Sequence, residues 1–246
     1  FAELATAFPD PGGDYHFLRL AYGRSLSFLF AWSRFAVINS GSIALLGYVL
    51  GDYLNVVLPL GALGPPLYAA LSVVILTAFN LRGAGPKNDA ADYGLTSLEV
   101  VGLLVMVAAA ITLILQGVAP VEQVDMNALK APPAGLGYAL VYALLAFGGW
   151  SEVATLSAEV RDPRRGMARA LIAAALIITA LYLAVNWAFW YGLGLDGLAR
   201  STTPAADLIA LAFGRWAGLV TALAIAFAVI TSINATIVVG ARTTYA

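Results

Sequence analysis

The sequence of 246 residues contains no cysteine, one histidine and few charged residues. Without cysteine it has no disulfide, no thiolate metal ligand and no cysteine nucleophile. The single histidine, His16, argues against a histidine-based metal site. Charged residues make up 11% of the chain and the net charge is -1, which excludes the basic surface of a nucleic-acid-binding protein.

Apolar residues, in contrast, are abundant. They make up 61% of the chain and its mean hydropathy is +0.86, which is too apolar for a water-soluble domain of this length. They lie in blocks of roughly 20 residues or more, long enough at about 1.5 Å per residue to cross a hydrocarbon core about 30 Å thick. Such segments must be helical, because a lipid-exposed strand would leave backbone groups unpaired. The sequence therefore predicts an all-α integral membrane protein.

Six membrane spans and one short helix are predicted. The spans are 26–54, 65–81, 95–117, 136–159, 167–193 and 215–241. Thr203 as N-cap, Pro204 at the first helical position and Gly214 at the end predict a helix over 204–213, which we expect at the outer mouth. Both ends of the chain look cut, so we expect residues 1–246 to be a fragment of a single transmembrane domain.

Lysine and arginine residues concentrate in alternate loops. One side holds Arg19, Arg24, Arg82, Lys87, Arg161, Arg164, Arg165, Arg169 and Arg242, and the other holds Lys130, Arg200 and Arg215. Because cytoplasmic loops carry an excess of these residues, the first side is expected to be cytoplasmic. The sequence therefore predicts a multi-pass protein of the plasma (cell inner) membrane, with loops 8–25, 82–94 and 160–169 in the cytoplasm.

The fourth predicted span contains two adjacent glycines, Gly148 and Gly149, near its middle. Each costs about 1 kcal/mol relative to alanine in a helix interior. One explanation is a break at 147–150, whose free N–H and C=O groups would hold the charged groups of a substrate. The other is close packing against a neighbouring helix. The polar Glu152 favours the break, because a lipid-facing helix would not carry it.

Residues 142–171, YALLAFGGWSEVATLSAEVRDPRRGMARAL, resemble the sixth helix and following loop of the amino acid/polyamine/organocation (APC) permeases. The family pattern there is an aromatic residue, a glycine pair or Gly-Phe/Trp, and then E-E-V-x-x-P-x-R. Residues 2–23 resemble the loop after helix two, 80–88 the loop between helices four and five, and 232–246 helix eight. The Phe-Gly-Gly-Trp form looks most like the L-type amino-acid transporter branch and related bacterial permeases.

This resemblance implies a LeuT-type inverted-repeat helical bundle, incomplete in this chain, with a substrate site at mid-membrane. The chain would supply the end of helix two and helices three to eight, so the fragment alone is not expected to transport. The implied substrate-binding residues are Ala146, Phe147, Gly148, Gly149, Trp150 and Ser151 from helix six, Val37, Ile38 and Ser42 from helix three, and Ile230 and Asn234 from helix eight. Ordinary bundle packing stays open for Val37 and Ile38.

Two ionisable residues fall inside the predicted spans. Arg34 is interpreted as a structural ion pair or as a side chain that snorkels to the interface. Glu99 lies in LTSLEVVGLL, which resembles a family segment whose lysine can stand in for a sodium ion. A carboxylate desolvated there would be able to bind and release a coupling proton, which makes Glu99 the candidate coupling residue. Proton and sodium coupling are both left open.

The sequence thus predicts secondary active transport of an amino acid across the lipid bilayer by alternating access, as proton symport or amino-acid exchange. No cofactor, metal or enzymatic activity is expected, because the sequence contains no phosphate loop and no nucleophile elbow. The alternatives are a polyamine or other organocation permease of the same family and a non-transporting bundle such as a channel or sensor. A polyamine site would need several carboxylates, and only Glu152 lies near the glycine pair.

Overall fold

The structure, a computed structural model, describes residues 2–8, 10, 12–82, 89–118, 120, 135–146, 148 and 168–245. Regular secondary structure in these residues is helical throughout, which confirms the predicted all-α membrane class. Five helical stretches in the described part of the chain are long and apolar enough to cross a membrane. They are Arg24–Val57, Gly61–Leu81, Ser97–Leu115, Arg169–Arg200 and Arg215–Val238. Residues 147 and 149–159, half of the predicted span 136–159, lie outside the described residues.

The chain divides into two compact units, which are described separately. The first comprises residues 1–34, 124–180 and 246, and the second comprises 35–123 and 181–245. The helices of the first unit are α1 (Ala2–Ala7), α2 (Asp14–Tyr22), α3 (Arg24–Ser33), α7 (Gly135–Ala146) and the first part of α8 (Ala168–Arg200). Helices α2 and α3 meet at Gly23, whose φ of 81° is a left-handed value that favours glycine.

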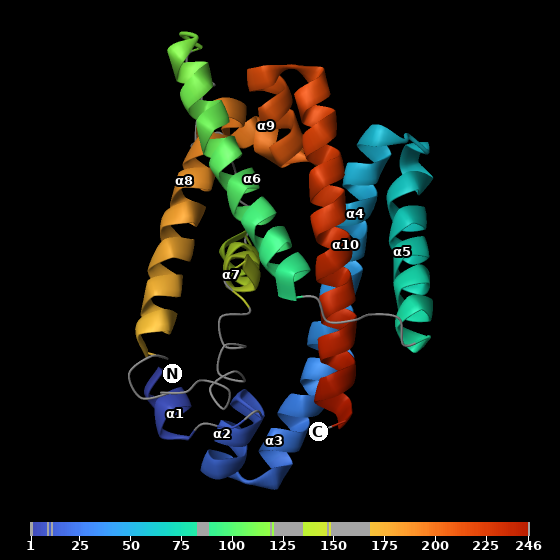
Figure 1. Cartoon of the computed structure of the whole chain (residues 1–246), viewed down its shortest axis with the longest axis vertical. Helices are drawn as coiled ribbons and strands as arrows, with labels where there is room; N and C mark the ends of the chain where they lie inside the picture. Colours follow the sequence, from blue (N-terminus) through green and yellow to red (C-terminus); the bar gives the residue numbers. More distant parts are fainter. Residues whose placement is uncertain are drawn as a thin grey trace. The chain divides into compact units, whose positions relative to one another are not determined.

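The second unit contains most of the long helices. They are the π-helix η1 (Arg34–Asn39), which begins at the last residue of the first unit, α4 (Ser40–Val57), the short 3₁₀ helix η2 (Gly61–Leu63), α5 (Gly64–Leu81), α6 (Asp89–Leu115), the end of α8, α9 (Pro204–Phe213) and α10 (Arg215–Tyr245). Helix α4 packs against both α5 and α10, and the three run alongside one another (Figure 1). Helix α9 packs against α10 and α6.

Small residues bring α4 and α5 into close contact. Gly51 is buried against the backbone of Pro65, and a Cβ atom built on Gly51 would lie 2.7 Å from the Pro65 Cα. One turn earlier, a Cβ on Gly47 would lie 3.3 Å from the Cβ of Ala69. Such close approach gains van der Waals contact in a bilayer, where lipid leaves no hydrophobic force to drive helices together.

The turn between α4 and α5 is held by side chains. Asn55 accepts a hydrogen bond from the Leu60 N–H at 2.9 Å and donates one to the Gly61 carbonyl at 3.3 Å. The Tyr68 hydroxyl donates to the Leu58 carbonyl at 2.8 Å. The turn therefore does not depend on the backbone alone.

Replacing Asn55 by alanine is expected to destabilise the full-length protein by about 1 kcal/mol, because both backbone partners lose their hydrogen bonds at an exposed site. The measurement is thermal unfolding of the purified protein in detergent. Asn55→Asp keeps the acceptor for Leu60 and should lose less. Equal stability of wild type and Asn55→Ala would contradict this function of the side chain.

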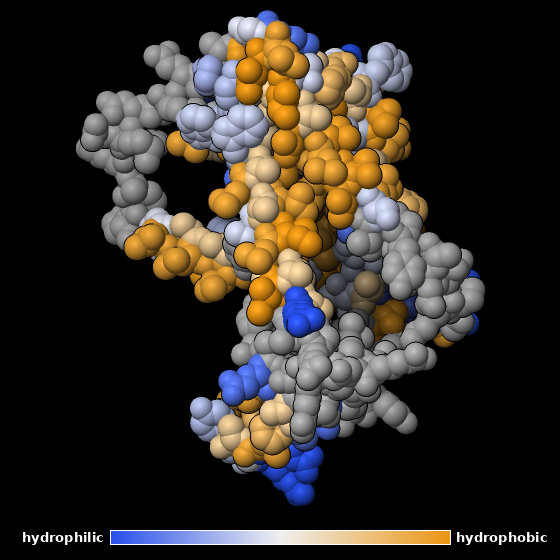
Figure 2. Space-filling model, turned by 60° about the vertical axis from the view of Figure 1, so that its left-hand side comes forward, coloured by the Kyte–Doolittle hydropathy of each residue, from blue (hydrophilic) through white to orange (hydrophobic). Residues whose placement is uncertain are grey.

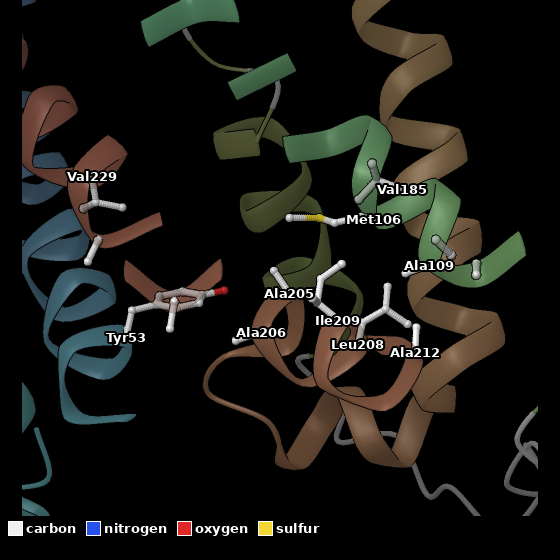
Figure 3. Packing of buried hydrophobic residues seen from close by; sticks show 14 of the residues in the cluster. Tyr53, Met106, Ala109, Val185, Ala205, Ala206, Leu208, Ile209, Ala212 and Val229 are labelled. Atoms are coloured by element: carbon white, nitrogen blue, oxygen red, sulfur yellow. The ribbon is translucent and has the colours of Figure 1, made fainter. Parts of the chain in front are cut away.

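A second packed region joins α6, α8, α9 and α10. Leu208, Ile209 and Ala212 of α9 are buried against Met106 and Ala109 of α6, and Figure 3 shows these side chains pointing toward one another. Tyr53 of α4 is also buried and points toward α9 in the same view. Helix α9 is therefore a buried packing element.

The ends of α9 follow its sequence. Thr203 is the N-cap, Pro204 is the first helical residue and Gly214 ends the helix with a φ of 91°. The Thr203 side chain makes no capping hydrogen bond. Instead, the Ser201 hydroxyl accepts from the Thr203 N–H at 3.1 Å and donates to the Asp207 carboxylate in the first turn of α9.

Large apolar side chains remain exposed on several helices. Examples are Leu63 on η2, Val74 on α5, Leu176 on α8 and Trp216 on α10, which are between 65% and 82% exposed. Figure 2 shows hydrophobic side chains covering much of the coloured part of one face. Such a surface is stable in hydrocarbon, which agrees with the membrane class.

Candidate functional site

The predicted helix-six site begins where α7 ends. Helix α7 ends at Ala146, and Gly148 lies in a turn with its surface exposed. Phe147, Gly149, Trp150 and Ser151 lie outside the described residues. The first glycine of the pair, Gly148, is thus assigned to a turn and not to a helix.

The predicted helix-three residues lie on and beside a π-helix. Val37 and Ile38 belong to η1, and their side chains are 61% and 53% exposed. Ser42 is half-buried in the first turn of α4. The neighbouring Ser40 hydroxyl donates a hydrogen bond of 2.6 Å to the Ala36 carbonyl. A side chain therefore supplies a hydrogen-bond donor to a backbone carbonyl of the wider π-helical turn. Single π-turns inside helices occur often at functional sites.

The predicted helix-eight residues lie one turn apart on α10. Ile230 is half-buried and packs against the buried core, and Asn234 is half-buried. The Oδ1 atom of Asn234 accepts a hydrogen bond of 2.7 Å from the Nδ2 atom of Asn80 on α5. Asn234 is therefore joined to a neighbouring helix by its side chain. Helices α4 and α10, which carry Ser42 and these two residues, pack together.

The two ionisable residues of the predicted spans occupy different settings. Glu99 lies on α6 with an exposed side chain, and Arg34 is half-buried at the start of η1. Groups of three or more His, Asp or Glu side chains that could hold a metal ion are absent from the described ranges. The role of Glu99 as the coupling residue stays a prediction from the sequence.

Sequence reasoning assigned no role to Asn39 and Asn80, two amides that the structure places against α10. The Nδ2 atom of Asn39 is buried and has no hydrogen-bond partner within the part of the chain that the structure describes. A Cβ on Gly240 of α10 would lie 3.1 Å from it. The sequence did contain a feature that could have identified them. Each is an asparagine within an apolar span, where polar side chains usually bind other helices or a substrate.

Taken together, these features define a multi-span helical membrane protein that carries polar groups between its helices and has a turn at Gly148, shortly after the last residue of α7. A family model described as amino acid permease matches residues 1–246. The chain belongs to this amino acid permease family, as its resemblance to APC permeases predicted.

Curated relatives match the whole chain. An uncharacterized transporter of Mycobacterium tuberculosis, Rv1999c, is 32% identical over 245 residues, which are 100% of this chain and 53% of the relative. The serine/threonine exchanger SteT of Bacillus subtilis is 24% identical over 253 residues, 100% of this chain and 55% of SteT. The human b(0,+)-type amino acid transporter 1 is 23% identical over 253 residues, 100% of this chain and 51% of that protein.

The chain therefore spans about half the length of the curated relatives it matches. These relatives are transporters, which agrees with the prediction that the protein is not an enzyme.

Proposed function

We propose that the full-length protein moves amino acids across a membrane by alternating access, as a proton symporter or an amino-acid exchanger. The match of the amino acid permease model to residues 1–246 carries this proposal. The names of two relatives, a serine/threonine exchanger and a b(0,+)-type amino acid transporter, support an amino acid as the substrate.

In this proposal the substrate binds where the fourth predicted span is interrupted, at 147–150. The end of α7 at Ala146 and the turn at Gly148 support an interruption, because free backbone groups at a helix end attract the carboxylate and ammonium of an amino acid. Phe147, Gly149, Trp150 and Ser151 complete the proposed helix-six contacts.

Two further helices are proposed to line the site. Val37 and Ile38 are exposed on η1, so ordinary packing within the second unit does not cover them. Ser42 on α4 and Ile230 on α10 are half-buried on helices that pack together. Apolar side chains beside polar backbone suit a neutral amino acid.

We place the protein in the plasma (cell inner) membrane, with loops 8–25, 82–94 and 160–169 in the cytoplasm. The excess of lysine and arginine in these loops supports this orientation. Cysteines introduced singly into the cysteine-free chain and labelled from outside intact cells would test it, because only non-cytoplasmic positions should react.

Uptake of labelled amino acids by proteoliposomes containing the full-length protein tests the transport proposal. The expected result is saturable uptake of one or more amino acids, driven by a proton gradient or by a trans amino acid. If no common amino acid is taken up but a polyamine is, the proposed amino-acid substrate is wrong and the protein is a polyamine permease.

Glu99→Gln is expected to uncouple uptake from the proton gradient if Glu99 binds the coupling proton. Glutamine keeps the size of the side chain but cannot gain and lose a proton. Gradient-driven accumulation should then fall about tenfold or more while amino-acid binding remains, which equilibrium binding and uptake at several pH values would measure.

Glu3→Gln is the control for Glu99, because Glu3 is an exposed glutamate of α1, outside the candidate spans. It should leave gradient-driven uptake unchanged. Wild-type accumulation in Glu99→Gln would remove Glu99 as the coupling residue and leave the transport proposal standing.

A further inference from the structure

Asn80 is the next-to-last residue of α5, and both hydrogens of its amide nitrogen are used. Nδ2 donates to the Leu76 carbonyl of its own helix at 2.8 Å and to Asn234 Oδ1 on α10 at 2.7 Å. The first bond fixes the direction of the side chain, and the second then joins two helices. The side chain of Asn80 is therefore already oriented when it meets α10.

Few other interactions fix the register between α5 and α10, the two helices that this bond joins. Helix α10 packs extensively along α4 but much less along α5. Contacts between apolar side chains add little preference for one register over another in hydrocarbon, because lipid tails offer the same contacts. A directional hydrogen bond between two half-buried amides selects one register, since sliding α10 by a turn would separate them.

A second amide lies beside the end of α10. Asn39, the last residue of η1, has its buried Nδ2 next to Gly240, where a side chain on α10 would approach within 3.1 Å. Asn234 and Gly240 lie in the second half of α10. This part of α10 is thus positioned by polar contacts with α5 and a close approach to η1.

We propose that Asn80 is a positioning residue that holds α10 against α5 through Asn234, and that Asn234 acts in transport through this clamp and not as a substrate ligand. For transport the inference rests on the proposed function. The clamp fixes the helix that carries Ile230, one turn from Asn234 and among the proposed site residues. The acceptor oxygen of Asn234 is directed toward α5 and is occupied by Asn80.

The first test is a double-mutant cycle on thermal unfolding of the full-length protein in detergent, without substrate. Asn80→Ala and Asn234→Ala should each lower the melting temperature by about 2–4 °C, and the double variant should fall by little more than either single variant. Additive losses would overturn the clamp. This test is independent of whether the protein transports amino acids.

The direction of the hydrogen bond gives a matched pair of variants. Asn234→Asp retains an acceptor for Asn80, whereas Asn80→Asp removes the donor and sets oxygen against oxygen. Both variants introduce the same carboxyl group at neighbouring places. The free-energy cost of burying it should therefore be similar in the two and should not decide their order. The melting temperature should fall further in Asn80→Asp, and the reverse order would overturn the assigned donor and acceptor.

Uptake kinetics separate positioning from substrate binding. Under the clamp, Asn80→Ala and Asn234→Ala should reduce maximal uptake by similar factors, about threefold or more, with the KM of the amino acid changed less than twofold. A KM raised tenfold in Asn234→Ala alone would show that Asn234 binds substrate and would overturn the proposal. Asn186→Ala on α8 is the control, since Asn186 bonds the Tyr182 carbonyl of its own helix.

Discussion

Gly51→Ala is expected to destabilise the full-length protein by about 3 kcal/mol, the largest effect of a single added methyl group among the described residues of α4. The new Cβ would overlap the Pro65 carbonyl oxygen and lie 2.7 Å from the Pro65 Cα. These are backbone atoms of α5, so no side chain can rotate away. Helix α5 would have to move outward along its contact with α4.

Thermal unfolding and size-exclusion profiles of the purified variant would measure this effect. The matched control is Gly102→Ala on α6, where a Cβ would meet no other atom within 4 Å and alanine should be neutral or stabilising. Gly47→Ala should fall between them, because its Cβ would lie 3.3 Å from a methyl carbon of Ala69. A Gly51→Ala variant as stable as wild type would refute the close packing of α4 on α5.

Replacing both Gly148 and Gly149 by alanine is expected to abolish most transport while leaving the protein folded. Alanine favours continuous helix by about 1 kcal/mol at each position, so about 2 kcal/mol would oppose the proposed interruption. Transport that needs an interrupted helix should then fall about tenfold or more, because about 1.4 kcal/mol corresponds to a factor of ten. Thermal stability should stay equal or increase.

Gly137→Ala provides the control within the same predicted span. Gly137 lies in α7, and a Cβ there would meet no atom within 4 Å, so alanine adds helix preference without a clash. This variant should transport like wild type. Normal transport by the double alanine variant would show that the glycine pair serves close packing, which is the alternative that the sequence leaves open.

Local chemistry explains which features could be predicted from sequence. The ends of α9 follow from a proline at its start and a glycine at its stop, because each acts through its own backbone. Helix α8 has non-helical backbone at Gly194, with φ at 65°, next to the predicted end of a span at 193. Long apolar runs likewise predict helices through length and composition alone.

Features that depend on distant residues escaped prediction. The π-helix at Arg34–Asn39 has no composition that distinguishes it from α-helix. The bond between Asn80 and Asn234 joins residues 154 positions apart, and neither side chain indicates its partner. The resemblance to APC permeases placed Asn234 among the substrate-binding residues but could not indicate that a neighbouring helix occupies its oxygen.

The packing of α4 on α5 has a consequence for biosynthesis. The two helices are consecutive, so they can enter the bilayer as a preassembled hairpin soon after Leu81 is made. Its partner Asn234 is made 154 residues after Asn80, which takes about 8 to 30 s at the usual rates of translation. During that interval one amide hydrogen of Asn80 lacks its final acceptor. Because Asn80 is the next-to-last residue of α5, water at the membrane surface can accept that hydrogen until α10 displaces it.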